Sequence, residues 1–218
     1  MKKVFGVVLG VIFTLSAQAV MYNVNMVVDN GFGLYKGSSS SVISYIGGSR
    51  DMGTLSQFNH DFDRGDYVYV YAWDWGSVEG FIGEFISQDN NYKSFLTTIA
   101  DGWEVMIPQL QNNYASSPIP TASQIIPEVL SGQWALVQHS LGRTRWGAYQ
   151  FPEIDEPAVW IWGVEQDRNN PINSFVFRHE ISVPQDNAVP EPASMLLLGL
   201  GVLGIAGFRK KQRSLKAI

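Results

Sequence analysis

The chain has 218 residues and a formal net charge of −5, and it contains no cysteine. A chain without cysteine has no disulfide scaffold, thiol nucleophile, iron–sulfur cluster or thiolate zinc site. Aromatic residues make up 13% of the chain and charged residues only 16%, which excludes a disordered chain. Length alone allows one or two domains.

The first predicted element is an export signal at residues 1–19. Lys2 and Lys3 precede an apolar run that ends at Leu15, and an Ala-Gln-Ala segment closes the signal at Ala19. This three-part layout is typical of a secretory signal peptide. We therefore expect passage through the Sec translocon and cleavage by signal peptidase after Ala19. The alternative is an uncleaved membrane anchor.

The body of the chain, residues 20–189, is predicted to be a single mostly β domain. It holds 19 acidic and 8 basic residues, a net charge of −11, so we expect no nucleic acid as a partner. Many short strands joined by Gly, Asn and Asp turns are typical of a β-sandwich or jelly roll. Strands are predicted at 23–28, 32–36, 42–46, 66–73, 78–87, 103–107, 158–163 and 172–182, and one helix is predicted at 121–130, where Pro127 sets a limit.

Three aspartates precede the clearest predicted strand. Asp61, Asp63 and Asp66 form the densest group of oxygen donors in the sequence, and Ca²⁺ binds six to eight oxygens. The spacing does not fit an EF-hand loop, which needs a Glu at position 12. The hypothesis of a calcium site at these three residues therefore stands beside a simpler one. In the simpler hypothesis, Arg64, Gly65 and Asp66 form a turn that leads into the strand.

The strand at 66–73 alternates strictly between two sets of side chains. Both sets are apolar, so we expect a central strand with a covered surface on each side. One face carries Tyr67, Tyr69, Tyr71 and Trp73, and the other carries Val68, Val70 and Ala72.

A candidate ligand site follows at the end of this strand. Trp73 and Trp75 are two residues apart and so lie on one side, with Asp74 between them. Exposed indole rings beside carboxylates suit sugar recognition, because sugar C–H groups stack on the ring and hydroxyls bond to the acid. The alternative is that these aromatic side chains belong to the core, as most aromatics in sandwiches do.

No catalytic residue is assigned, and we expect the domain not to be an enzyme. The histidines, His60, His139 and His179, lie in separate segments without a nucleophile motif. A further acidic group lies between Pro152 and Pro157, in a segment predicted to be a solvated loop. Its members are Glu153, Asp155 and Glu156. A glycosidase would require two such carboxyls across a cleft.

Several segments of the body together resemble exported galactose-binding-like β-sandwich modules. This resemblance implies the fold and supplies no ligand, because such modules serve many functions. The segments are Asp29-Asn30 leading into 32–37, then 65–73, then Trp160-Ile161-Trp162 and Phe175-Val176-Phe177-Arg178.

The C-terminal segment at 190–213 has three parts in order. Pro190-Glu191-Pro192 comes first, an uncharged apolar stretch at 193–208 follows, and a basic cluster at 209–213 ends it. Sixteen residues rise about 24 Å as a helix, slightly less than a bilayer core, and flanking basic side chains can make up the difference. The positive-inside rule places the basic cluster in the cytoplasm and the body outside. The cluster consists of Arg209, Lys210, Lys211 and Arg213.

This tail resembles the PEP-CTERM sorting signal of Gram-negative bacteria. The resemblance covers residues 189–213 and implies processing near Pro190-Glu191-Pro192 by an exosortase, a membrane protease-transpeptidase. It also implies a precursor anchored in the inner membrane and a mature form at the cell surface or in the extracellular matrix. The family usually occurs in bacteria that make exopolysaccharide, often in a biofilm. The alternative is an ordinary anchor with one span that is never cut.

Three functional hypotheses follow for the body. The first is a non-catalytic binding module for glycan or exopolysaccharide, and it rests on the aromatic stripe and the sandwich pattern. The second is an exported hydrolase of polysaccharide or peptide, and it rests on the loop acids and the scattered histidines. The third is a structural matrix protein that binds copies of itself. Apart from Ca²⁺ at the aspartates, no cofactor is expected.

Overall fold

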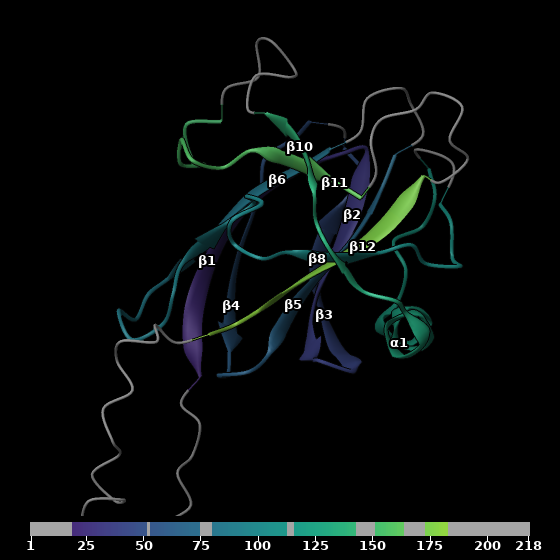
Figure 1. Cartoon of the computed structure of the whole chain (residues 1–218), viewed down its shortest axis with the longest axis horizontal. Helices are drawn as coiled ribbons and strands as arrows, with labels where there is room; N and C mark the ends of the chain where they lie inside the picture. Colours follow the sequence, from purple (N-terminus) through teal and green to yellow (C-terminus); the bar gives the residue numbers. More distant parts are fainter. Residues whose placement is uncertain are drawn as a thin grey trace, which may run out of the picture. The chain divides into compact units, whose positions relative to one another are not determined.

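The computed structural model describes residues 19–51, 53–74, 80–112, 116–142, 151–163 and 173–182. Within these ranges the chain forms two antiparallel sheets that face each other, with one helix against the second sheet (Figure 1). The mostly β, sandwich-like architecture predicted from the sequence is thus confirmed. The elements are β1 Val20–Asp29, β2 Gly31–Ser38, β3 Ser41–Ser49, β4 Ser56–Phe62, β5 Tyr67–Trp73, β6 Gly80–Ser87, β7 Phe95–Leu96, β8 Glu104–Met106, α1 Ala122–Ser131, β9 Ala135–Leu136, β10 His139–Gly142, β11 Trp160–Trp162 and β12 Ser174–Glu180.

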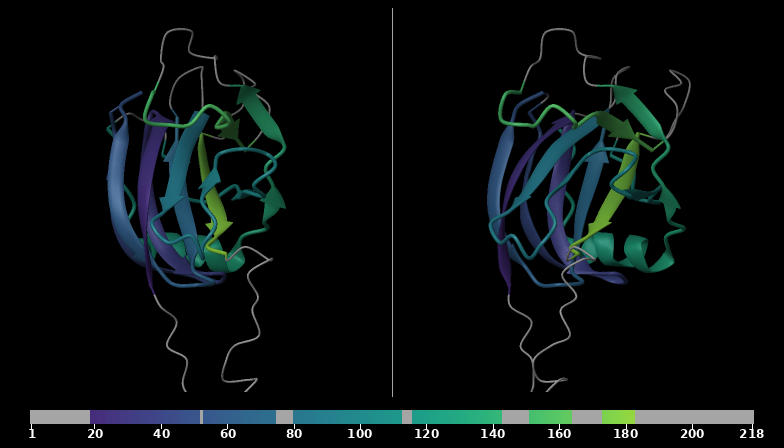
Figure 2. Two further views of the ribbon diagram at one scale, coloured as in Figure 1. Left: turned by 90° about the vertical axis from the view of Figure 1, so that its left-hand side faces the viewer. Right: turned by 60° about the vertical axis from the view of Figure 1, so that its left-hand side comes forward.

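Each sheet has six strands among the described residues. The first follows the order β10-β11-β6-β1-β4, with β7 paired to β6, and is called sheet A below. The second follows the order β3-β2-β5-β12-β8-β9 and is called sheet B. Every pairing is antiparallel, and the two views in Figure 2 show the sheets stacked on one another.

The main core lies between the two sheets and is rich in aromatic side chains. Phe85 stacks on Phe95 with ring centroids 4.6 Å apart, and Trp103 meets Phe81 edge to face at 5.3 Å. Offset stacks and edge-to-face contacts of this kind add stability beyond the area they bury. Residues from both sheets contribute, including Val24, Met26 and Phe85 from sheet A and Leu34, Val70 and Phe177 from sheet B.

Strand β5 confirms the alternation predicted for it. Val68, Val70 and Ala72 enter the main core, whereas the aromatic side chains on its other face enter a second core beneath α1. β5 lies between β2 and β12, so it is central in its sheet. The second core includes Tyr35, Tyr69, Tyr71, Trp73, Met106, Ile125, Val129 and Val176.

The helix covers sheet B because its apolar residues recur on one face. Ile125 and Val129, four positions apart, are buried against the sheet. The helix begins after Thr121, whose backbone N–H donates to the Gln124 side chain at 2.9 Å. Pro127 lies inside the helix, which continues to Ser131.

The outer face of sheet A is covered differently, by the loop at 151–159. Ile154 and Ala158 of this loop pack on Val27, Ile82 and Trp160 in a small third cluster. The acids of this loop remain at the surface, as predicted from the flanking prolines.

The signal predicted at 1–19, apart from Ala19, and the tail predicted at 190–213 lie outside the described residues. Within the part of the chain that is described, no helix has the length and apolar character needed to cross a membrane.

Candidate functional site

The predicted sugar platform at Trp73 and Asp74 is wrong for both of these residues. Trp73 has no exposed surface and Asp74 is 1% exposed. Trp73 is enclosed because it points into the second core, where its ring lies 5.8 Å from that of Tyr71. The third predicted residue, Trp75, lies outside the described ranges.

The aspartates predicted as calcium ligands surround a lysine instead. Lys36 Nζ lies 2.8 Å from Asp66 Oδ2 and 3.2 Å from Asp63 Oδ2, and it donates to the Asp61 carbonyl oxygen at 3.1 Å. Burial alone would lower the pKa of Lys36, but hydrogen bonds to Asp66 and Asp63 raise it. The ammonium group supplies the positive charge that a metal ion would bring.

Asp63 and Asp66 also form the turn at 63–66 that the simpler hypothesis predicts. The Asp63 N–H donates to Asp66 Oδ2 at 2.6 Å, and Gly65 has a φ of 82°. Among the described residues, no group of three His, Asp or Glu side chains is arranged to hold a metal ion. Asp63 and Asp66 therefore form a turn whose negative charge is offset by Lys36, and the calcium hypothesis stays a prediction.

One of the three histidines, His179, is enclosed within the core. His179 Nε2 lies 2.8 Å from the Asp101 carbonyl oxygen, and the ring stacks on Phe95 with centroids 3.9 Å apart. Burial is the main cause that lowers the pKa of His179, so the ring is neutral at pH 7. A neutral ring held between Phe95 and Trp103 fills the core and has no access to a substrate.

Two carboxyl groups that are distant in the sequence lie at one end of the sandwich. Asp29 ends β1 and Asp74 follows β5, and they are 3% and 1% exposed. Asn30 Nδ2 donates to Asp29 Oδ1 at 2.6 Å. Burial, aided by repulsion from Asp74, raises the pKa of Asp29 to about 7. Because both residues are almost fully buried, this pair belongs to the interior, and neither residue lines the hollow described below.

A cation–π cluster lies at the surface of sheet B. The Arg178 guanidinium lies 4.0 Å from the ring centroid of Trp134 and 5.2 Å from that of Tyr67. Glu104 Oε2 accepts a hydrogen bond from Arg178 Nε at 2.6 Å and holds the guanidinium between the rings. Tyr67, Trp134 and Arg178 are half-buried, and we call these three residues the aromatic rim.

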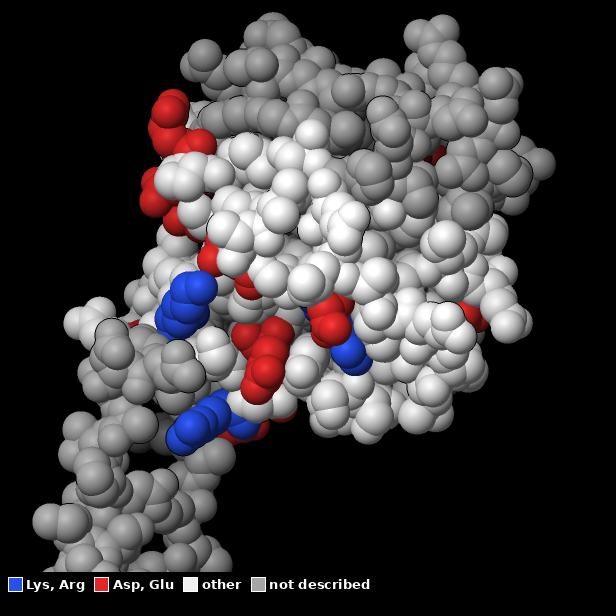
Figure 3. All heavy atoms as spheres, viewed as in Figure 1, with Lys and Arg blue, Asp and Glu red and all other residues white. Residues whose placement is uncertain are grey.

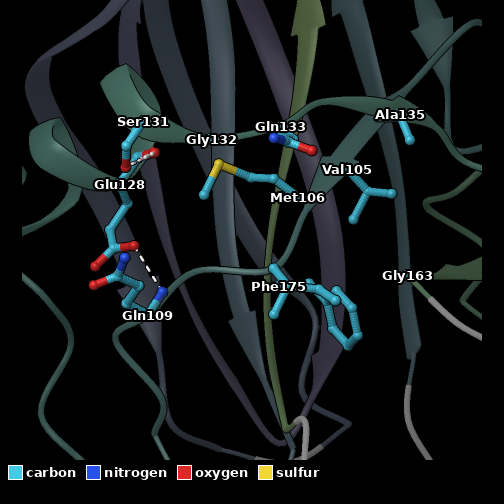
Figure 4. Close-up of a pocket in the computed structure, with 11 residues that line it drawn as sticks. Val105, Met106, Gln109, Glu128, Ser131, Gly132, Gln133, Ala135, Gly163 and Phe175 are labelled. Carbon is cyan, nitrogen blue, oxygen red and sulfur yellow. Dashed lines mark hydrogen bonds between the residues drawn. The ribbon is translucent and has the colours of Figure 1, made fainter.

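A hollow of about 380 Å³ lies beside the end of α1 (Figure 4). One of its lining residues, Gln133, directly precedes Trp134 of the aromatic rim in the sequence. Gly132 and Met106 meet there, and a Cβ at position 132 would lie 2.2 Å from Met106 Sδ. The amide side chains of Gln109 and Gln133 add polar groups, and both residues are exposed. This size and mixed lining fall within the range of sites for small molecules.

One acid of the hollow has a structural role. The Glu128 carboxylate accepts the backbone N–H groups of Gln109 at 2.7 Å and Leu110 at 3.1 Å. It thereby fixes the segment after β8 against the helix, as the dashed line in Figure 4 shows for Gln109. The amides of Gln109 and Gln133 are the polar groups that an incoming molecule would meet.

The charges of the described residues do not form a basic patch on the face shown in Figure 3. Blue and red atoms lie near one another there, separated by wide areas without charge. Elsewhere among the described residues, Lys93 pairs with Asp101 at 3.1 Å and Arg178 with Glu104 at 2.6 Å.

Comparison with known proteins identifies the tail of the chain. The family model of the PEP-CTERM protein-sorting motif matches residues 188–211. The motif indicates an exported protein that is anchored by its C-terminal tail before an exosortase processes it. The sorting motif predicted at Pro190, Glu191 and Pro192 falls within the matched residues. No curated protein and no solved structure matches the chain.

Proposed function

We propose that this exported, exosortase-sorted protein presents a non-catalytic domain that binds neutral glycan at the surface of sheet B. The observation that carries the proposal is the hollow beside α1, with the exposed amides of Gln109 and Gln133 and with Trp134 next to Gln133 in the sequence. Amide side chains bond to sugar hydroxyls, and the part of the half-buried Trp134 ring that Arg178 leaves exposed suits a sugar C–H face. The site thus replaces Trp73 and Asp74 as the place where a sugar would bind.

The location of the mature protein favours a glycan among possible ligands. The body resembles galactose-binding-like modules, and the PEP-CTERM family occurs in bacteria that make exopolysaccharide. An acidic body with a net charge of −11 would be repelled by an anionic polymer, so a neutral or weakly charged polysaccharide fits best. We place the mature protein at the cell surface or in the extracellular matrix.

The hydrolase hypothesis receives less support from the described residues. His179 is enclosed by Phe95 and Trp103, and the loop acids Glu153, Asp155 and Glu156 are exposed to solvent outside the hollow. Glu84 bonds to the Asp155 N–H at 2.9 Å and so anchors this loop to sheet A. His179 and Glu84 therefore have structural roles, and we regard the hollow as the better candidate for function.

The test is binding of the body, residues 20–189, to the host's exopolysaccharide and to a glycan array, with and without Ca²⁺. We expect saturable binding that does not depend on Ca²⁺. Gln133→Ala and Trp134→Ala should each weaken it at least fivefold, because a missing hydrogen bond or stacking contact costs about 1 kcal/mol.

Gln88→Ala is the matched control, because Gln88 is exposed but does not line the hollow. Its affinity should equal that of the unchanged protein. Circular dichroism shows first that each variant is folded. A folded body that binds no glycan, or a loss of binding that is equal in the Gln88 control, contradicts the proposal.

A further inference from the structure

Sheet edges differ in how well they are protected against pairing with another chain. An edge strand presents free N–H and C=O groups, which proteins normally cover, shorten or interrupt with bulges. In sheet B, β3 has two register shifts against β2, and its Val42 packs under α1. Among the described strands, β9 has two residues, and the four-residue β10 has a register shift against β11. These three edges are therefore poorly suited to pairing.

Strand β4 ends sheet A and, unlike those strands and the two-residue β7, is neither short nor interrupted by a register shift. Its seven residues pair with β1 in unbroken register, from Val20↔Phe62 to Met26↔Ser56. The strand reads Ser-Gln-Phe-Asn-His-Asp-Phe and contains no Lys, Pro or Gly. Figure 2 shows it as the outermost blue strand of sheet A on the left. Strand β4 therefore offers a regular edge of a length typical for a strand.

The side chains of β4 leave this edge of the sandwich only partly enclosed. Phe58 and His60 point toward the sandwich interior, yet both are only half-buried. Phe58 meets Phe32 edge to face at 6.1 Å, so one side of its ring is packed. On the outer face, Gln57, Asn59 and Asp61 are exposed. A strand added at this edge would cover apolar surface as well as backbone groups.

We propose that two copies of this chain pair through β4, antiparallel and centred on Asn59. This is the register in which all seven residues find a partner, and two-fold symmetry makes the contact close on itself. On the outer face Asn59 meets its own copy, and Gln57 of each chain lies opposite Asp61 of the other. Gln57 Nε2 donates to Asn25 Oδ1 at 3.0 Å within its own chain, and its second N–H can donate to the Asp61 carboxylate of the other copy, a charge-assisted hydrogen bond.

The inner face of β4 fits the same register. Phe58 of each copy lies opposite His60 of the other, which places two flat rings side by side. Burial is the main cause that lowers the pKa of His60, with a smaller contribution from Lys36, so a neutral ring is covered at pH 7. Lys36 bonds to the Asp61 carbonyl, and that oxygen retains a second lone pair for the N–H of an added strand. The occupant of this edge is therefore a second copy of the same chain.

The absence of cysteine allows a direct test in the full chain. Asn59→Cys places one thiol per molecule at the two-fold axis, where Cβ atoms of opposed residues lie within about 5.5 Å. The chain is expressed with its own export signal in a Gram-negative bacterium, whose periplasm favours disulfides. We expect a disulfide-linked dimer on a non-reducing gel, at least tenfold more abundant than for the matched control Gln88→Cys.

A charge exchange then tests the register. Gln57→Asp in the Asn59→Cys chain sets two carboxylates against each other at each end of the pair, and the linked dimer should fall at least fivefold. Adding Asp61→Lys restores opposite charges and should restore the dimer. All three positions are exposed, so the fold is not expected to change.

Each outcome decides the proposal. A disulfide-linked dimer that decreases with Gln57→Asp and is restored by adding Asp61→Lys supports the proposal. Equal linking of the Asn59 and Gln88 variants, linking of neither, or a dimer unaffected by Gln57→Asp overturns it. The experiment is independent of the glycan site, because no residue of the hollow or the rim is changed.

Discussion

The two ends of strand β5 carry aspartates in opposite electrostatic settings. Before its first residue, Asp63 and Asp66 bind the ammonium group of Lys36, which reaches across from β2. After its last residue, Asp74 lies near Asp29, whose closest described partner is the neutral amide of Asn30. At this second end burial raises the pKa of Asp29 to about 7.

The difference shows that burial and neighbouring charges together set the environment of each cluster. Burial stabilises the neutral form of a carboxyl such as Asp29, whereas an ammonium group such as that of Lys36 attracts a carboxylate. The two ends should therefore respond differently to substitution. Each prediction below changes one end and leaves the other as a reference.

The largest effect is expected at the Asp29 end, where burial raises a carboxyl pKa. Because folding raises the pKa of Asp29 from 3.8 to about 7, its neutral form contributes stability that is complete below pH 4. That contribution is lost as the pH rises through 7, a change of about 4 kcal/mol over the full range. Urea denaturation from pH 4 to pH 8 should show this fall in the free energy of unfolding.

Asp29→Asn separates this titration from all others in the chain. The asparagine oxygen can still accept the Asn30 amide, but the side chain no longer ionises. The variant should match the unchanged protein at pH 4 and exceed its stability at pH 8. Since Asp74 contributes to the shift, the difference between the two proteins reports on the pair. Parallel stability curves for both proteins would contradict the assignment.

The next effect is expected from removing the cation at the opposite end. Lys36→Met leaves Asp63 and Asp66 without their shared partner, and we expect a loss of about 2 kcal/mol at pH 7. Lys93→Met is the matched control, because Lys93 is half exposed beside Asp101 and should lose less than about 0.5 kcal/mol. An equal loss in both variants would contradict the role given to Lys36.

Much of the fold could be predicted from local patterns in the sequence. The alternation at 67–73 gave the position and both buried faces of β5, because side chains on a strand alternate with a period of two. The helix expected at 121–130 is found at Ala122–Ser131. Strand β4 was missed because three of its seven residues are Gln, Asn and Asp and only Phe58 and Phe62 are strongly apolar. Its pairing with β1 supplies the order that its composition lacks.

The candidate site was harder to predict, because its parts are distant in the sequence. Trp134 follows α1 and Arg178 lies on β12, and no local pattern links them. Trp73 stood out for its neighbours, yet the tertiary fold placed a helix over it. Lys36 is 27 residues from Asp63, so the calcium hypothesis had no means of anticipating a lysine at the cluster. Sequence patterns identified the chemical groups, and the sheet order determined which groups meet.

The smallest predicted effect separates the two aspartates that share Lys36. Asp66 is 15% exposed, lies 2.8 Å from Lys36 Nζ and also accepts the Asp63 N–H, whereas the Asp63 carboxyl is 42% exposed and lies 3.2 Å away. Solvent screens the more exposed pair, so Asp63→Asn should cost less than about 0.5 kcal/mol and Asp66→Asn about 1 kcal/mol. Urea denaturation at pH 7 measures both. Equal losses would mean that Lys36 is shared evenly by a solvated pair, and the contrast with the buried Asp29 end would then rest on exposure alone.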